Sequence, residues 1–135
     1  MKKHKLFLDA NVLFSAAYRE QAGLLVLWQL KNVTLCSSQY AVHEALRNLS
    51  DVSQKNRLQQ LLEPMEIIST EQSSHTLEVD LKEKDKPIIL GAIKAKADYL
   101  ITGDFRDFGK YFGKTIQGVI ILPPAEYLKS ESQRS

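Results

Sequence analysis

The sequence predicts an α/β fold built on a parallel sheet of about five strands. Short apolar segments alternate along the chain with longer segments in which apolar residues recur at helical spacing. Strands that alternate with helices are typical of right-handed crossovers, which cover both faces of a parallel sheet with helices. A chain of 135 residues has the usual size of one domain. We therefore expect a single domain over residues 1–135, with a frayed polar tail over 130–135.

Five segments have the composition of short buried strands. Each is mostly apolar, and most are followed by residues that end a strand, such as the aspartate after Leu8 or the glycine after Thr102. Near-continuous apolar runs of this kind are typical of strands that are buried on both faces. The expected strands are residues 5–8, 33–37, 65–69, 98–102 and 118–122.

Helices are expected in most of the intervals between these strands. Ser37 or Ser38 can cap the third of them, because serine side chains accept hydrogen bonds from the first helical amides. A polar amphipathic segment is expected over 71–81. The expected helices are residues 9–18, 24–30, 40–49, one containing Leu58 that stops near Pro64, 88–95, and a short one through Tyr127.

Composition and charge narrow the class of protein. Hydrophobic residues make up 44% and charged residues 25%, as is ordinary for a globular protein in water. The apolar stretches fall well short of the ~20 residues that span a bilayer. No signal peptide is expected, because the apolar run after the basic N-terminus breaks at Asp9. We therefore expect a cytoplasmic protein without membrane association, in which the single cysteine, Cys36, is a core residue.

Four acidic residues fall where predicted strands end or lie on predicted helices. Asp9 follows the first strand and Asp104 follows the fourth, while Asp85 precedes the helix that leads into the fourth strand. Glu44 borders the apolar stripe of its helix. Each has an ordinary explanation when considered alone: the aspartates can cap helices, and the glutamate can be solvated. Together they are expected to converge, because ligands bind where the carboxyl ends of parallel strands meet.

A cluster of these acids, with Asp107 as a fifth nearby, predicts a site for a divalent metal. Like charges within a few ångströms raise one another's proton affinity, and one or two bound Mg²⁺ or Mn²⁺ ions relieve this repulsion. Such a site activates water for in-line attack on phosphorus, leaving 5′-phosphate and 3′-hydroxyl ends. We interpret the chain as a metal-dependent phosphodiesterase, in the first place a ribonuclease.

The ordered motifs that contain these acids resemble those of the PIN-domain nucleases. The resemblance implies a three-layer α/β/α sandwich, and cleavage of single-stranded RNA that depends on Mg²⁺ or Mn²⁺. It covers nearly the whole chain, although each motif alone is weak. The motifs are residues 8–13, Glu44, 85–92, 97–104 with Asp107 and Phe108, and 120–128.

The resemblance also implies roles for particular residues and for partners. The acidic site of the family matches Asp9, Glu44, Asp85 and Asp104, with Asp107 as a second candidate for the last acid. Asn11 and Thr102 match polar residues that support the site. Many small stand-alone members are toxins that an antitoxin protein holds inactive, and such members often form homodimers.

Basic residues near the proposed site are candidates for contacts to the RNA backbone. They are Lys84, Lys86, Arg106 and Lys110, with Lys114 beyond them. Phosphate contacts supply affinity without base specificity, but an ordinary solvated face explains these residues equally well. Lys86 can also compete with a metal for the charge of its neighbour Asp85. The nearby aromatic residues can stack on bases, but their helical spacing favours the core for most of Phe105, Phe108, Tyr111 and Phe112.

Two other classes of function are considered on the residues alone, and the second is disfavoured by residues that can be read directly. One is a catalytically silent PIN-like module that binds RNA or a protein partner. The other is a different phosphoryl enzyme with an aspartate after its first strand. A phosphatase of the haloacid-dehalogenase type would need an aspartate where Asn11 stands, and a phospho-receiver domain would need a lysine where Pro123 stands.

Overall fold

The computed structural model describes residues 3–69, 77 and 79–134, apart from the side chains of 133 and 134. A six-stranded sheet runs through the molecule in the order β3-β2-β1-β4-β6-β5. All neighbouring strands are parallel except β5 and β6, which are antiparallel. The strands are β1 (His4–Leu8), β2 (Val33–Ser38), β3 (Glu66–Ile68), β4 (Tyr99–Ile101), β5 (Thr115–Ile116) and β6 (Val119–Leu122).

The five predicted strands are the five parallel strands, so the predicted sheet is confirmed. The short antiparallel strand β5 at the edge was not predicted. Its two residues are too few to show the alternation of apolar and polar residues that identifies a half-buried strand.

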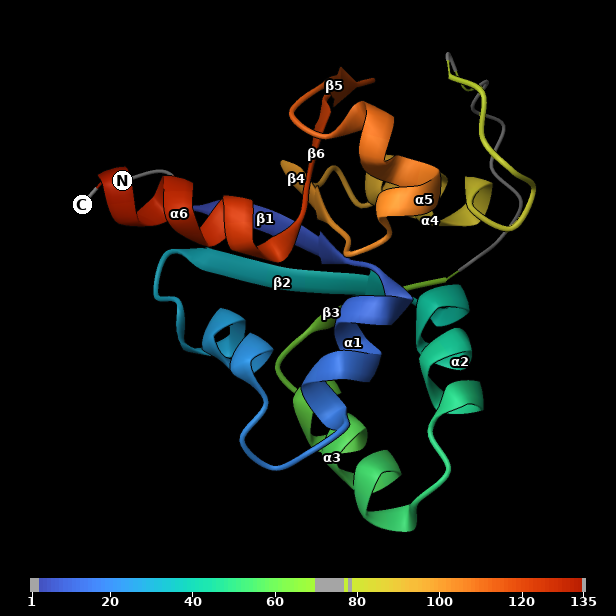
Figure 1. Cartoon of the computed structure of the whole chain (residues 1–135), viewed down its shortest axis with the longest axis vertical. Helices are drawn as coiled ribbons and strands as arrows, with labels where there is room; N and C mark the ends of the chain where they lie inside the picture. The colour runs from blue at the N-terminus through green and yellow to red at the C-terminus, as the bar shows by residue number, and fades with distance from the viewer. Residues whose placement is uncertain (1–2, 70–76, 78, 135) are drawn as a thin grey trace.

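Helices cover both faces of the sheet, as predicted. Figure 1 shows α1, α2 and α3 on one side of the sheet and α4, α5 and α6 on the other. The helices are α1 (Ala10–Ala17), α2 (Gln39–Asn48), α3 (Val52–Leu62), α4 (Lys86–Lys94), α5 (Phe105–Phe108) and α6 (Pro124–Arg134), with the 3₁₀ helices η1 (Gly23–Gln29) and η2 (Gly109–Tyr111).

The direction of the chain across the sheet reverses between β1 and β4. From β1 the chain moves outward through β2 to β3, and it then returns through α4 to β4 on the other side of β1. Right-handed crossovers that run in opposite directions place their helices on opposite faces. The loops after β1 and β4 therefore diverge to opposite faces and leave a crevice at the carboxyl ends of these two strands.

Two predicted helices differ in the structure. The segment expected as a helix over 24–30 forms the 3₁₀ helix η1, which begins at Gly23 and has no side-chain cap. The final helix does not stop near Tyr127 but continues to Arg134. The Tyr127 hydroxyl donates to Glu131 Oε1 at 3.1 Å, and His4 Nδ1 lies 3.2 Å from the same oxygen, so the added turns are tied to the sheet. The segment expected to be amphipathic, 71–81, lies largely outside the described residues.

The core is centred on β1 and β4, whose side chains are almost entirely buried. Leu6, Phe7 and Leu8 are fully buried, as are Leu100 and Ile101 on the neighbouring strand. Helix α4 packs closely against this region at Gly91, where an added Cβ atom would lie 3.0 Å from Cζ of Phe7. Cys36 is also fully buried, as predicted, and burial raises the pKa of its thiol to about 12. Among the described residues, no helix combines the length and the apolar character needed to cross a bilayer.

Candidate functional site

A cavity of about 450 Å³ lies at the carboxyl ends of β1 and β4, where the strand order reverses. All four predicted acids line it, although two follow the ends of strands, one lies on α2 and one directly precedes α4. The side chains that line it are Asp9, Ala10, Asn11, Phe14, Tyr40, Glu44, Asn48, Lys84, Asp85, Ile88 and Asp104. The fold therefore brings together acids that are widely separated in sequence.

Asp9 is both the cap of α1 and a wall of the cavity. Its Oδ1 accepts a hydrogen bond from the Ala10 amide at 2.6 Å, and its Oδ2 accepts one from Thr102 Oγ1 at 2.7 Å. Only 5% of the residue is exposed. Burial raises the pKa of the carboxyl to about 6, against the opposing effect of the hydrogen bond from Thr102. The helix-cap explanation is thus correct for this residue, but it does not exclude a second role.

Asn11 and Thr102 join the loop after β1 to the loop after β4. Asn11 Nδ2 donates to both Asp9 Oδ2 and Thr102 Oγ1 at 3.3 Å, and Asn11 Oδ1 accepts from the Gly103 amide at 2.8 Å. Thr102 Oγ1 also accepts from the Asp104 amide at 3.1 Å. A Cβ atom at Gly103 would lie 3.3 Å from Asn11 Oδ1, which favours glycine there. Asn11 and Thr102 thus lie between Asp9 and the loop that carries Asp104, a position from which they could support the acids.

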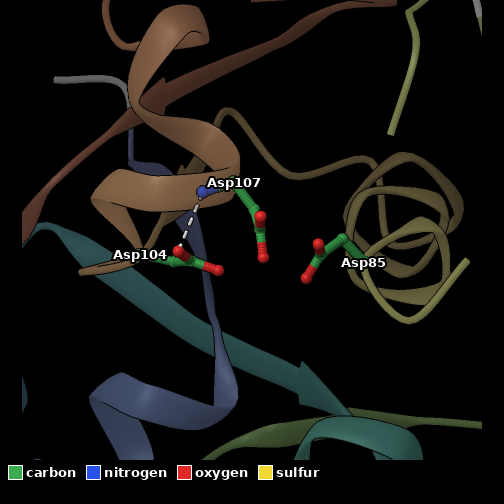
Figure 2. A group of neighbouring side chains, drawn as sticks. All are labelled: Asp85, Asp104 and Asp107. Atoms are coloured by element: carbon green, nitrogen blue, oxygen red, sulfur yellow. Dashed lines mark hydrogen bonds between the residues drawn. The ribbon is translucent and has the colours of Figure 1, made fainter. Parts of the chain in front are cut away.

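Asp85, Asp104 and Asp107 form a close group of carboxylates on the other side of the crevice. Each offers an oxygen within 4.8 Å of the others, and Figure 2 shows Asp85 at the start of α4 facing the other two across the gap. Asp104 caps α5 by accepting from the Asp107 amide at 3.0 Å. The cap explanation fails for Asp85, because its side chain accepts no capping hydrogen bond from α4.

The Asp85 carboxyl has a buried oxygen without a hydrogen-bond partner. Among the described residues, its Oδ2 is the one buried side-chain nitrogen or oxygen atom left unsatisfied. Burial, and then the neighbouring Asp107, raise the pKa of this carboxyl to about 6. A buried oxygen without a partner costs free energy unless a ligand satisfies it.

Asp107 differs from the other acids because two lysines hold it. Its Oδ1 lies 3.1 Å from Lys82 Nζ and its Oδ2 lies 3.3 Å from Lys84 Nζ. The hydrogen bond from Lys82 is the largest of the effects that lower the pKa of this carboxyl to about 2. Both of its oxygens are therefore paired with cations, and Lys84 also lines the cavity.

Glu44 faces the same cavity from α2 but is paired with a neighbour on its own helix. Its Oε1 lies 3.1 Å from Arg47 Nη1, and the Glu44 side chain is about one third exposed. Helix α2 is linked to the segment before α4 by Tyr40, whose hydroxyl donates to the Lys84 carbonyl at 2.8 Å. The glutamate is thus a peripheral member of the acidic set.

These donors fit a hard divalent cation. The acids offer carboxylate oxygens only, which suit Mg²⁺ and Mn²⁺ better than they suit zinc or copper. A cation between Asp85 and Asp104 would satisfy the buried Asp85 oxygen and would offset the burial and the neighbouring negative charges that raise the pKa of the Asp85 carboxyl. No nitrogen or sulfur ligand lines the cavity among the described residues.

The family model for the PIN domain matches residues 5–106 of this chain. The chain belongs to the PIN-domain family. Its fold also resembles the crystal structure of VapBC2 from Rickettsia felis bound to a DNA fragment from their promoter, with a TM-score of 0.62 and 16% sequence identity. That match covers 88% of this chain and 98% of the other. No curated protein sequence matches the chain.

The basic residues predicted to contact RNA are divided between two parts of this PIN domain. Lys84 lines the acidic cavity, whereas Arg106 and Lys110 line a neighbouring cavity of about 470 Å³ that also contains Lys82 and Asp107. Lys86 pairs with Glu83 at 2.7 Å. Lys86 was expected to compete with a metal for the charge of Asp85, but its ion pair is with Glu83 instead. Lys114 is exposed.

The aromatic residues of the PIN domain near the site mostly belong to the core, with one exception. Phe108 is fully buried, and Tyr111 and Phe112 are half-buried against the core. Phe105, however, is 69% exposed, so it is the exception to the prediction that most of these four residues belong to the core. The four-residue helix α5 is too short to turn all of its aromatic side chains inward.

Some residues of the site were missed by sequence reasoning. Lys82 and Tyr40 were not predicted, although one holds Asp107 and the other fixes Lys84. Lys82, Lys84 and Lys86 alternate with acids over residues 82–86, and this repeat of lysines was the available signal. Tyr40 carries no such signal, because its partner is a backbone carbonyl 44 positions away.

Proposed function

We propose that this PIN domain is an endoribonuclease that cleaves single-stranded RNA and depends on Mg²⁺ or Mn²⁺. The observation that carries the proposal is the convergence of Asp9, Asp85 and Asp104 on one cavity at the reversal of strand order. Membership in the PIN-domain family supports the reaction class.

The chain's own residues have distinct parts in the proposed reaction. Asp9, Asp85 and Asp104 would hold one or two ions, with Glu44 at the wall of the cavity. When bound, the dication supplies positive charge that activates water and neutralises a phosphate oxygen. Thr102 and Asn11 keep Asp9 in place and stabilise its charged form by donating hydrogen bonds.

Cations around the cavity would hold the RNA backbone. Lys84 lies at the acidic cavity, and Arg106 and Lys110 lie at the adjoining one. Their contacts to phosphate would be independent of sequence and would weaken as salt rises. Lys86, which pairs with exposed Glu83, would add to the same field.

Cleavage of RNA in the presence and absence of chelator tests the proposal. We expect the purified protein to cut single-stranded RNA with Mg²⁺ or Mn²⁺, leaving 5′-phosphate and 3′-hydroxyl ends, and to stop when chelator is in excess. Asp9→Asn and Asp85→Asn should abolish cleavage, whereas Glu20→Gln, a change at an exposed acid on the surface, should not. Equal cleavage in chelator would overturn the proposal. RNA binding without cleavage under any metal would instead favour the silent module.

The proposal extends to the biological role, which we take to be that of a cytoplasmic toxin neutralised by an antitoxin protein. Its support is the resemblance to small stand-alone PIN-domain toxins, together with the fold shared with Rickettsia felis VapBC2. Expression in a bacterial host should arrest growth, and Asp9→Asn should relieve the arrest. Light scattering would show whether the protein is a homodimer. A host that grows normally while producing active nuclease would refute the toxin role and leave the nuclease intact.

A further inference from the structure

A second hollow adjoins the acidic cavity on the α1 side. Its volume is about 410 Å³, and it lies between the end of α1 and the start of η1. Phe14, Tyr18, Ala22 and Leu24 give it a mainly apolar lining, and Arg19 stands among them. Phe14 also lines the acidic cavity, so the two hollows meet at a single side chain.

The two aromatic residues of this hollow lie side by side, Phe14 on α1 and Tyr18 at the C-terminal cap of that helix. The ring centroids of Phe14 and Tyr18 are 5.4 Å apart, with the planes tilted by 46°. Tyr18 is 54% exposed, so a large part of its side chain is accessible to a ligand. A nucleic-acid strand that leaves the acidic cavity past Phe14 would therefore contact the ring of Tyr18 next.

The backbone beneath these rings is held firmly by α3. The Tyr18 carbonyl accepts hydrogen bonds from Gln54 Nε2 at 3.1 Å and from Arg57 Nη2 at 3.2 Å. Arg57 Nε also donates to the Ala17 carbonyl at 3.0 Å. These bonds fix the backbone at the end of α1, so little backbone ordering is needed when a ligand binds beside the two rings.

We propose that Phe14 and Tyr18 form a base-stacking subsite for the RNA strand whose phosphodiester lies in the acidic cavity, with Arg19 contacting a backbone phosphate. This inference rests on the proposed function. Aromatic faces stack on any nucleobase, so the subsite would add affinity without strong sequence preference. A basic side chain at the edge of an aromatic surface is the combination that single-stranded nucleic acid requires, since it offers both a stacked base and a charged backbone.

Continuity with the acidic cavity favours RNA over a protein as the occupant. A protein partner would need an apolar surface but no link to the acids, whereas a substrate must pass from one hollow into the other. Phe14 provides that link. The positive charge of Arg19 also matches a phosphate better than it matches an apolar helix.

Binding of a labelled single-stranded RNA of mixed sequence tests the subsite. Fluorescence anisotropy would be measured with Asp9→Asn protein, so that cleavage does not interfere. We expect Tyr18→Leu, which keeps apolar bulk but removes the aromatic face, to weaken binding about tenfold. Val52→Ala is the control, because Val52 is an exposed apolar residue that lines neither hollow and lies outside the proposed RNA contacts, and it should change binding less than about twofold. Thermal melts would show that both variants fold.

An RNA strand of the same length with abasic sites separates stacking from other effects. The Tyr18→Leu variant and its parent should bind the abasic strand equally, because there is no base to stack. Arg19→Gln should lower the slope of log affinity against log salt by about one. Equal binding of the normal strand by Tyr18→Leu and its parent would overturn the subsite. So would a loss of binding that coincides with the loss of a homodimer in light scattering, because the hollow would then serve a second copy of the chain.

Failure of the stacking subsite can be distinguished from failure of the proposed nuclease activity. Cleavage that persists in a Tyr18→Leu protein with unchanged RNA affinity would remove the subsite and leave the nuclease. Binding that depends on Tyr18 in a protein that never cleaves RNA would remove the nuclease and leave the subsite.

Discussion

Thr102 Oγ1 donates a hydrogen bond of 2.7 Å to Asp9 Oδ2 across 93 positions of sequence. The same oxygen of Thr102 accepts from the Asp104 amide, so one hydroxyl contacts the segments that present two of the acids. Because Thr102 is fully buried, water cannot replace it. The position and the charge of Asp9 therefore depend on a side chain that touches the cavity only through other residues.

Replacing this hydroxyl should weaken the site without removing an acid. Thr102→Val keeps the shape of the side chain but takes away a hydrogen bond that lowers the pKa of Asp9. The pKa should therefore rise further above about 6, and at neutral pH the affinity for Mn²⁺ should fall about tenfold or more, as is typical when a partner of a metal ligand is lost. Isothermal titration calorimetry measures this directly.

The controls for Thr102 separate its hydroxyl from its packing. Thr102→Ser restores the donor and should recover most of the affinity. Thr115→Val removes a threonine hydroxyl at an exposed position on β5 and should have no effect. Unchanged Mn²⁺ affinity in Thr102→Val would show that the hydrogen bond does not support the site.

Buried carboxyls make the stability of the metal-free protein fall as pH rises. The pKa values of Asp9 and Asp85 are raised to about 6 in the folded protein, against a usual value near 4. Between these values the folded state binds more protons than the unfolded state does, so the stabilisation is complete below pH ~4 and is lost as pH rises through 6. Thermal melts in chelator should therefore show lower melting temperatures at pH 7 than at pH 5.

The stability of the Asp9→Asn variant should also depend on pH, because it lacks the buried carboxyl of Asp9. The variant avoids a buried charge at neutral pH, so its stability relative to the parent should rise by up to about 3 kcal/mol between pH 4 and pH 7 in chelator. This change adds to a loss that does not depend on pH, because the asparagine amide cannot accept the hydrogen bonds from both Ala10 and Thr102. Excess Mg²⁺ should shift the difference in favour of the parent, because ligand binding stabilises only the protein that retains the site. Glu20→Gln is the exposed control, with no pH-dependent difference expected. A stability difference between Asp9→Asn and its parent that does not change with pH in chelator would contradict the raised pKa of Asp9.

Asp104 and Asp107 were both candidates for the last acid of the site, and their contacts predict different behaviour. Both oxygens of Asp107 are paired with Lys82 and Lys84, while Asp104 lines the cavity. Asp104→Asn should abolish cleavage, because asparagine still caps α5 but carries no charge for a cation. Asp107→Asn should leave Mn²⁺ affinity within about threefold and should chiefly alter RNA affinity, by releasing the two lysines. Equal losses of Mn²⁺ affinity in the two variants would make Asp107 a ligand as well.

The sequence predicted the parallel sheet well because each strand carries its own signal. Segments such as Leu6–Phe7–Leu8 are apolar throughout, and this pattern depends on burial of both faces and not on a particular neighbour. The convergence of the acids could also be predicted, since it follows from strand direction. Strand β5 could not, because its two residues form a strand only by pairing with β6.

The charge state of the acids could not be read from the sequence. Asp85 and Asp107 are both aspartates close to lysines in the sequence. In the structure, however, Asp85 has a buried oxygen without a hydrogen-bond partner, whereas Asp107 is paired with two lysines. That difference arises from how α4 and α5 approach each other. The exposure of Phe105 has a similar origin, since helical spacing fails as a guide in a helix of four residues.

Gly91 should be the residue of α4 that is least tolerant of a larger side chain. A Cβ atom there would lie 3.0 Å from Cζ of Phe7, a fully buried ring on β1, two positions before Asp9. Alanine is favoured over glycine in a helix by about 1 kcal/mol, but overpacking a core costs about 1–3 kcal/mol. Gly91→Ala should therefore be neutral to destabilising. Gly91→Val should clearly lower the urea concentration at which the protein unfolds. Gly109→Ala is the matched control, because a Cβ atom there meets nothing within 4 Å and the φ angle of −54° suits alanine. If Gly91→Val unfolds at the same urea concentration as the parent, then α4 is free to move away from β1, and the spacing between Asp85 and Asp9 is not fixed by this contact.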